Sequence, residues 1–126
     1  DERIKYFGYL PSRQDLVNKQ AEATMLISTR RETEIASKYC FPSKLFEYMA
    51  SGNPVISCRL GGIPDEYFDY LIELPTVTPE GIAETIKKVA AMSPEVRETI
   101  GEKQKRFVLE EKNKSAQGKK ILDFAK

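Results

Sequence analysis

Short apolar runs alternate with helical segments along most of this chain. Runs of strand length occur at residues 4–10, 24–29, 54–58 and 70–74. The run TMLIST at 24–29 is continuously apolar, which is typical of a central parallel strand that is covered on both faces. Strands that alternate with helices favour an α/β domain with a mostly parallel sheet. We therefore predict a small parallel sheet of four strands.

Helix-start signals separate these strands. Ser12, with Asp15 three residues later, predicts a capped helix that runs to about Ala23. The segments 78–80 and 93–95 both read hydroxyl, proline, glutamate, which places a cap, a first-turn proline and a carboxylate at the positive end of a helix. A last amphipathic segment, 115–126, carries three apolar side chains that we expect to pack: Ile121, Leu122 and Phe124.

Composition excludes several classes of function. The 126 residues and 40% hydrophobic content fit one domain, and 20 basic against 19 acidic residues give no global attraction to nucleic acid. The absence of histidine excludes Ser-His-Asp triads, Cys-His pairs and histidine-ligated zinc within this chain. Cys40 and Cys58 lack metal-ligand spacing, so we interpret both as small core residues in a reducing cytosol. No apolar run approaches the ~20 residues of a membrane-spanning helix.

The densest chemical pattern begins at Pro42, which predicts the first turn of a helix that ends at Ser51-Gly52. A polar stretch at 30–40, predicted to be a long loop, leads into it from the carboxyl end of a strand, where open α/β sheets usually bind ligands. The start of this helix, with a serine hydroxyl at residue 43 and a lysine at 44, suits a phosphate.

Glu47 follows Lys44 by three residues, hence on the same helix face one turn deeper. A carboxylate there can accept hydrogen bonds from vicinal hydroxyls, as acidic residues do for ribose in dinucleotide sites. Phosphate and diol binding on one helix indicates a nucleotide. The structural alternative is that Ser43 only caps the helix, that Lys44 is solvated, and that Glu47 pairs with Lys44.

The strings FPSKLFEYMASGNPVI and GGIPDEYFDY closely resemble the C-terminal domain of retaining glycosyltransferases of the family 4 type. The similarity is greatest to bacterial enzymes of capsule and exopolysaccharide biosynthesis. IKYFGYL, AEATMLIST and KRFVLEEKNKSAQGKKILDF resemble further parts of that domain in the same order. The resemblance implies a Rossmann-like parallel sheet, the C-terminal half of a GT-B glycosyltransferase. It also implies that residues 1–126 are a partial domain, incomplete at its N-terminus and without the acceptor-binding domain.

The resemblance further implies that a UDP- or GDP-sugar binds mainly to this domain. A hexose would then be transferred, with retention of configuration, to a polysaccharide or lipid-linked acceptor. We expect no metal or other cofactor and no nucleic-acid partner. The parent protein is expected in the cytoplasm, with peripheral membrane association at the inner face of the plasma membrane if the acceptor is lipid-linked. This chain alone is expected to be inactive, because the basic residues that neutralise the leaving diphosphate in the family precede residue 1.

Six residues match donor-binding positions of the family: Glu47, Ser43, Lys44, Leu45, Gly8 and Tyr9. The resemblance assigns Glu47 to the ribose hydroxyls. It assigns residues 43–45 to the helix start that meets the diphosphate. Gly8 and Tyr9 match a turn whose backbone lies near the base.

The first glutamate of the family's Glu, seven residues, Glu motif falls at residue 39, which is Tyr39 here. Either Glu32 or Glu34 reaches in from the loop, or the sugar is recognised by other means, or activity is lost. Glu34 is the candidate catalytic residue. A non-catalytic α/β interaction module with a degenerate nucleotide site is therefore the alternative function. Gly61 and Gly62 match a glycine turn, and we interpret them as needed for positive φ angles rather than for donor contact.

Overall fold

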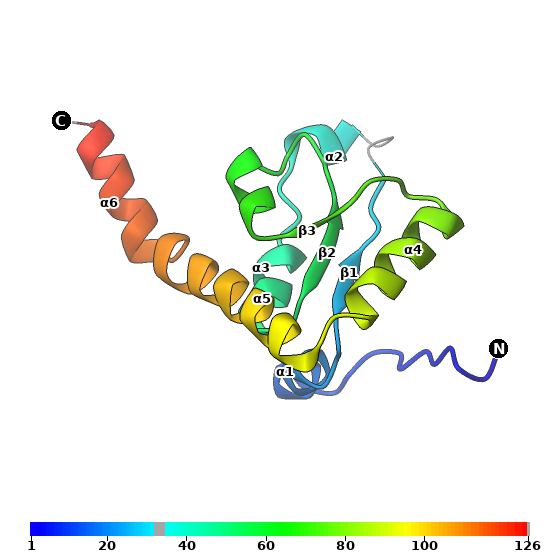
Figure 1. Cartoon of the computed structure of the whole chain (residues 1–126). Coiled ribbons are helices and arrows are strands. Elements are labelled where there is room, and N and C mark those ends of the chain that lie inside the picture. Colours follow the sequence, from blue (N-terminus) through cyan, green and yellow to red (C-terminus); the bar gives the residue numbers. More distant parts are fainter. Residues whose placement is uncertain (32–34, 126) are drawn as a thin grey trace.

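The sheet has three parallel strands that lie side by side in chain order (Figure 1). They are β1 (Leu26–Ser28), β2 (Val55–Cys58) and β3 (Ile72–Leu74) in a computed structural model that describes residues 1–31 and 35–125. Helices flank the sheet, so the predicted Rossmann-like α/β class is confirmed.

Two predictions about the sheet are wrong. The central strand is β2, all of whose residues are buried, whereas the run at 24–29 forms the edge strand β1, which pairs only with β2 and is half-buried. The run at 4–10 forms no strand, and Tyr6 and Tyr9 within it are 94% and 97% exposed. An apolar run becomes a strand only where a neighbour pairs with its backbone N–H and C=O groups, and no described strand lies beside this one.

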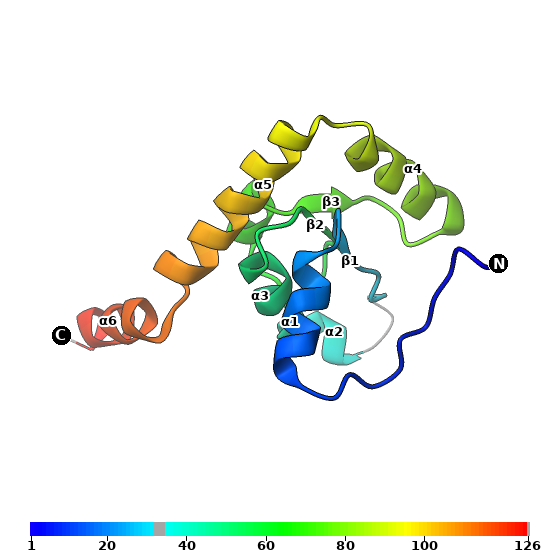
Figure 2. The same cartoon turned by 90° about the horizontal axis from the view of Figure 1, so that it is seen from below.

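Two helices lie together on one side of the sheet, α1 (Arg13–Ala21) and α3 (Lys44–Ala50), while α4 (Pro79–Ala90) lies on the other (Figure 2). The predicted cap of α1 is confirmed, because the Ser12 hydroxyl accepts a hydrogen bond of 3.1 Å from the Asp15 amide. The predicted loop at 30–40 is wrong in part, since it contains the short helix α2 (Ile35–Tyr39).

The predicted caps of α4 and of α5 (Pro94–Arg106) are also confirmed. The Thr78 hydroxyl accepts from the Gly81 amide, and the Ser93 hydroxyl accepts from the Val96 amide. None of the helices in the described part of the chain is long and apolar enough to span a lipid bilayer.

Beyond α5 the chain passes through a π-helical turn, η2 (Phe107–Glu111), into α6 (Lys114–Phe124), which leads away from the sheet (Figure 1). The prediction that the apolar side chains of this last segment pack is wrong. No residue of α6 is buried, and three of its apolar side chains are exposed: Ile121, Leu122 and Phe124. The helix projects beyond the elements that could cover it.

Buried apolar side chains from α3, the sheet, α4 and η2 form the core: Leu45, Met49, Val55, Ile56, Leu74, Val89 and Phe107. One buried polar side chain joins α5 to this core. The side-chain oxygen of Gln104, which is 0% exposed, accepts a hydrogen bond of 3.0 Å from the Val55 amide. Its side-chain nitrogen donates one of 2.9 Å to the Tyr70 carbonyl. Gln104 therefore fixes α5 against the start of β2 and the approach to β3.

An aromatic cluster surrounds Tyr67, which lies in the 3₁₀ helix η1 (Asp65–Asp69). The Tyr67 ring is 4% exposed, and its centroid lies 4.9 Å from that of Phe41 and 5.0 Å from that of Phe107. Burial, together with the nearby Glu66 charge, raises the pKa of Tyr67 to about 12.

The glycine turn after β2 is needed for close approach, so the positive-φ interpretation is wrong. Neither Gly61 nor Gly62 has a positive φ. A Cβ at Gly62 would lie 2.3 Å from the Cys40 carbonyl oxygen, and one at Gly61 would lie 2.8 Å from the Lys38 carbonyl oxygen. The prediction of two core cysteines is confirmed only for Cys58, because Cys40 is exposed where the chain leaves α2.

Candidate functional site

Helix α3 separates core residues from predicted site residues. Leu45 and Met49 are 0% exposed and point into the core, which fixes the rotation of the helix. Ser43, Lys44 and Glu47 are consequently exposed on its outer side. The helical period alone produces this division, since residues three and four apart share a face.

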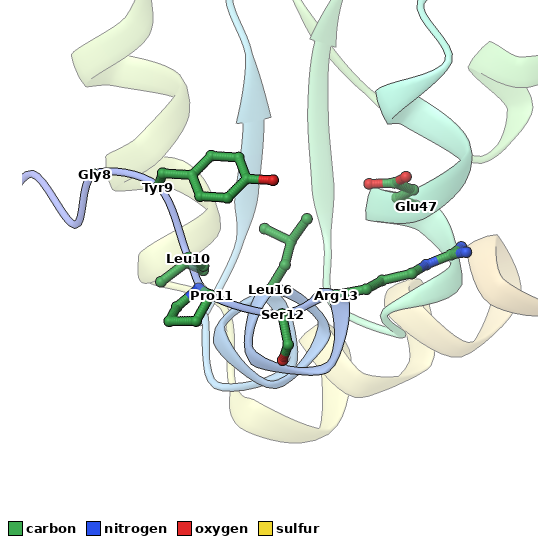
Figure 3. Close-up of a pocket in the computed structure, with 8 residues that line it drawn as sticks. All are labelled: Gly8, Tyr9, Leu10, Pro11, Ser12, Arg13, Leu16 and Glu47. Atoms are coloured by element: carbon green, nitrogen blue, oxygen red, sulfur yellow. The ribbon is translucent and has the colours of Figure 1, made fainter.

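The first cavity, of about 570 Å³, lies between residues 8–13, Leu16 on α1 and Glu47 on α3 (Figure 3). It brings together three of the predicted residues, namely Gly8, Tyr9 and Glu47, although 39 positions separate the first from the last. Figure 3 shows the Tyr9 ring and the Glu47 carboxylate directed toward each other across the cavity, with the Leu16 side chain rising toward the space between them.

A second cavity, of about 440 Å³, lies where the carboxyl end of β1 meets the start of α3. Residues 27–30, residues 42–44 and Tyr48 line it, so it contains the predicted Ser43 and Lys44 and adds Arg30. This is the edge of the sheet at which the sequence predicted a ligand. Two cationic side chains and a serine hydroxyl give the cavity the chemistry of an anion site.

The alternative in which Ser43, Lys44 and Glu47 have only structural roles is met in part. The Ser43 hydroxyl makes no capping hydrogen bond, because Ser43 already has helical backbone angles (φ −54°, ψ −28°). Within residues 1–31 and 35–125, Lys44 and Glu47 form no ion pair with each other. Two of the three structural roles are therefore unfilled, while Lys44 is exposed as that alternative requires.

Leu45 and Tyr39 lie outside both cavities. The Leu45 side chain lies in the core, and its amide donates a hydrogen bond of 2.9 Å to the Pro42 carbonyl. Tyr39, at the position where the resemblance predicts the first glutamate of the motif, is exposed on α2. The predicted catalytic candidate Glu34 and its alternative Glu32 fall outside the described residues.

Sequence reasoning missed several residues that line the cavities: Arg13, Leu16, Arg30 and Tyr48. Arg13 extends from the first position of α1 toward α3 (Figure 3). It also lines a third cavity of about 320 Å³, which shares Arg13, Leu16 and Glu47 with the first and ends at Lys105 on α5. A signal existed for Arg30 alone, since it follows a strand at the ligand edge of the sheet.

The parallel sheet, its flanking helices and cavities at the end of β1 and along α3 define an α/β domain of the Rossmann-like class. The chain belongs to the family described as "Glycosyl transferase-like", whose model matches residues 1–123. No curated protein and no solved structure gives a significant match. Membership supports glycosyl transfer as the general activity, with a sugar donor and an acceptor as partners.

Proposed function

We propose that this chain is the donor-binding domain of a retaining glycosyltransferase that takes a hexose from a UDP- or GDP-sugar without a metal cofactor. The observation that carries the proposal is that α3 supplies Glu47 to one cavity and Ser43 with Lys44 to the next. The acceptor would be a growing polysaccharide or a lipid-linked sugar, at the cytoplasmic face of a bacterial membrane.

The spacing along α3 fits a nucleoside diphosphate. Lys44 and Glu47 are three positions apart, which corresponds to roughly 4.5 Å along a helix axis. A ribose whose hydroxyls donate to the Glu47 carboxylate would extend its 5′ phosphates toward Ser43 and Lys44. The charge of the Glu47 carboxylate strengthens such hydrogen bonds. Lys44 and Glu47 are both exposed and therefore accessible to a ligand.

The second cavity would contribute positive charge next to the leaving diphosphate. As the glycosidic bond to the diphosphate breaks, negative charge accumulates on the leaving phosphate oxygens. Cations that are already in position stabilise that charge most effectively in a site with little water. Lys44 and Arg30 both line this cavity and would face the diphosphate from α3 and from the end of β1.

A non-catalytic interaction module with a degenerate nucleotide site is the second candidate. The observation that favours it is Tyr39, which stands where the resemblance predicts the first glutamate of the motif. Its side chain is exposed, and the Lys38 ammonium lies over the Tyr39 ring, 5.6 Å from the ring centroid. A phenol paired in this way offers the donor sugar no carboxylate.

Calorimetric titration with UDP and with GDP separates the two candidates. We expect the chain to bind at least one of them, and Glu47→Ala to weaken binding by on the order of tenfold or more, since a charge-assisted hydrogen-bond acceptor is lost. Glu47→Gln keeps the shape of the side chain and removes its charge, so its affinity should lie between those of the wild type and Glu47→Ala. Glu84→Ala, an exposed glutamate on α4, is the matched control and should bind as the wild type does.

Circular dichroism of each variant establishes that it is folded. A folded chain that binds neither nucleotide, or one that binds equally well after Glu47→Ala, would overturn the proposal. The first of these results would favour the interaction module.

A further inference from the structure

Tyr9 occupies an unusual place on the surface. Its side chain is 97% exposed, yet it borders the first cavity instead of pointing away from the protein (Figure 3). The chain turns just before it, because Gly8 has φ +64°. A Cβ at Gly8 would meet no atom within 4 Å, so the backbone angle and not a lack of space requires glycine.

The same segment contacts α1 at Phe7, whose exposed ring has its centroid 5.0 Å from the Lys19 ammonium. This contact and the turn at Gly8 direct the next side chain over the cavity. Leu16, one helical turn into α1 and 38% exposed, presents an apolar surface to the same space. An aromatic face, an aliphatic side chain and a carboxylate thus surround one cavity.

We propose that the Tyr9 ring is the stacking platform for the nucleobase, with Leu16 packing against the base and Glu47 binding the ribose. The inference rests on the proposed nucleotide site. It assigns to the Tyr9 side chain a role that the sequence placed on the backbone of this turn. Stacking uses the π face that every base has, so Tyr9 would contribute to UDP and GDP binding alike.

Tyr6 provides the matched control within the same segment. Its ring is 94% exposed, almost as fully as that of Tyr9, but it lines none of the three cavities that contain predicted site residues. Any effect that depends only on an exposed aromatic side chain in this segment would appear in both Tyr9→Ala and Tyr6→Ala.

Titrations with UDP, GDP and ribose 5-phosphate, which lacks a base, test the inference. We expect Tyr9→Ala to weaken the binding of UDP and of GDP by similar factors, about five- to one-hundredfold for one lost stacking contact. Tyr9→Phe and Tyr6→Ala should retain wild-type affinity, and ribose 5-phosphate should bind wild type and Tyr9→Ala equally. In proton NMR, the uracil resonances of bound UDP should shift upfield with wild type and Tyr9→Phe but not with Tyr9→Ala.

Each contrary result is distinct. UDP binding that depends on Glu47 but is unchanged in Tyr9→Ala would overturn the stacking role and leave the proposed function intact. Equal losses for UDP and ribose 5-phosphate in Tyr9→Ala would overturn it too, because the ring would then act on the cavity as a whole. Failure of the wild type to bind UDP or GDP would overturn both proposals.

Discussion

The two walls of the first cavity are built very differently. The Glu47 wall is α3, which Leu45 and Met49 hold in the core with no exposed surface. The Tyr9 wall is the segment 4–10, which runs along the outside of the molecule without a strand partner among the described residues (Figure 1). Both stretches are rich in apolar residues, but only α3 buries them.

This difference separates stability from binding. Stability comes mainly from buried apolar surface and satisfied buried hydrogen bonds, which α3, β2 and α5 provide. The Tyr9 wall provides little of either, so a nucleotide that packed against it would complete contacts that the protein alone lacks. Substitutions near α3 should therefore change the free energy of unfolding, and those in the segment should change ligand affinity.

The largest expected effect is at Gln104, which joins α5 to the core beside α3. Gln104→Ala leaves the Val55 amide and the Tyr70 carbonyl without their side-chain partner in a buried site. We expect the free energy of unfolding in urea to fall by about 2–4 kcal/mol, since each buried unsatisfied group costs about 1–3 kcal/mol. That is a large share of the ~5–15 kcal/mol that a domain usually has.

Gln14→Ala is the control for this measurement. Gln14 has the same side chain on an exposed face of α1, where its amide nitrogen donates a hydrogen bond of 2.9 Å to the Asn18 side chain. Its loss should cost less than about 0.5 kcal/mol. Similar losses for the two variants would break the contrast between the core and the surface of α1.

A second, smaller effect depends on pH. Because burial raises the pKa of Tyr67 to about 12, above the ordinary value of about 10, the neutral phenol stabilises the fold fully below pH 10 and progressively less as pH rises through 12. At pH 11 the expected loss is about 1.4 kcal/mol, from 1.36 kcal/mol per pKa unit. Tyr67→Phe removes this loss.

Urea unfolding of wild type and Tyr67→Phe at pH 8 and pH 11 measures the difference. At pH 8 the two proteins should have nearly equal stability, and at pH 11 the variant should be the more stable. If the stability difference between the proteins is the same at both pH values, Tyr67 does not titrate as a buried core residue.

Local sequence signals predicted the elements whose ends are set locally. The hydroxyl caps at Ser12, Thr78 and Ser93 gave the helix starts, because a cap depends on residues within one turn. The division of α3 into a core face and a site face followed from its period. For the same reason Glu47, Ser43 and Lys44 were found together on its outer side.

Long-range pairing could not be predicted in the same way. The runs at 4–10 and 54–58 look alike as sequence, yet only the second has strand neighbours on both sides. Arg13 and Leu16 reach the Glu47 cavity because α1 lies beside α3 (Figure 2), which no local spacing encodes. The glycine turn at 61–62 likewise depends on the backbone carbonyl groups of Lys38, in α2, and of Cys40, just after it.

The smallest change in stability is expected at Gly8 in the Tyr9 wall, and the same substitution, glycine to alanine, at Gly62 in the packed turn after β2 provides the comparison. At Gly62 a Cβ would lie 2.3 Å from the Cys40 carbonyl oxygen, so Gly62→Ala must displace backbone and should lower the free energy of unfolding by more than about 1 kcal/mol. At Gly8 the cost is the φ of +64°, about 1 kcal/mol for a residue with a Cβ.

The segment around Gly8 has few contacts to lose, so it can relieve that strain by moving. Gly8→Ala should therefore change the free energy of unfolding by less than about 0.5 kcal/mol while it displaces the Tyr9 ring from the cavity. UDP affinity should then fall about fivefold, the equivalent of about 1 kcal/mol. A Gly8→Ala variant that lost as much stability as Gly62→Ala does would mean that the Tyr9 wall is as firmly packed as the turn after β2, and the view of this wall as a loosely packed segment would be wrong.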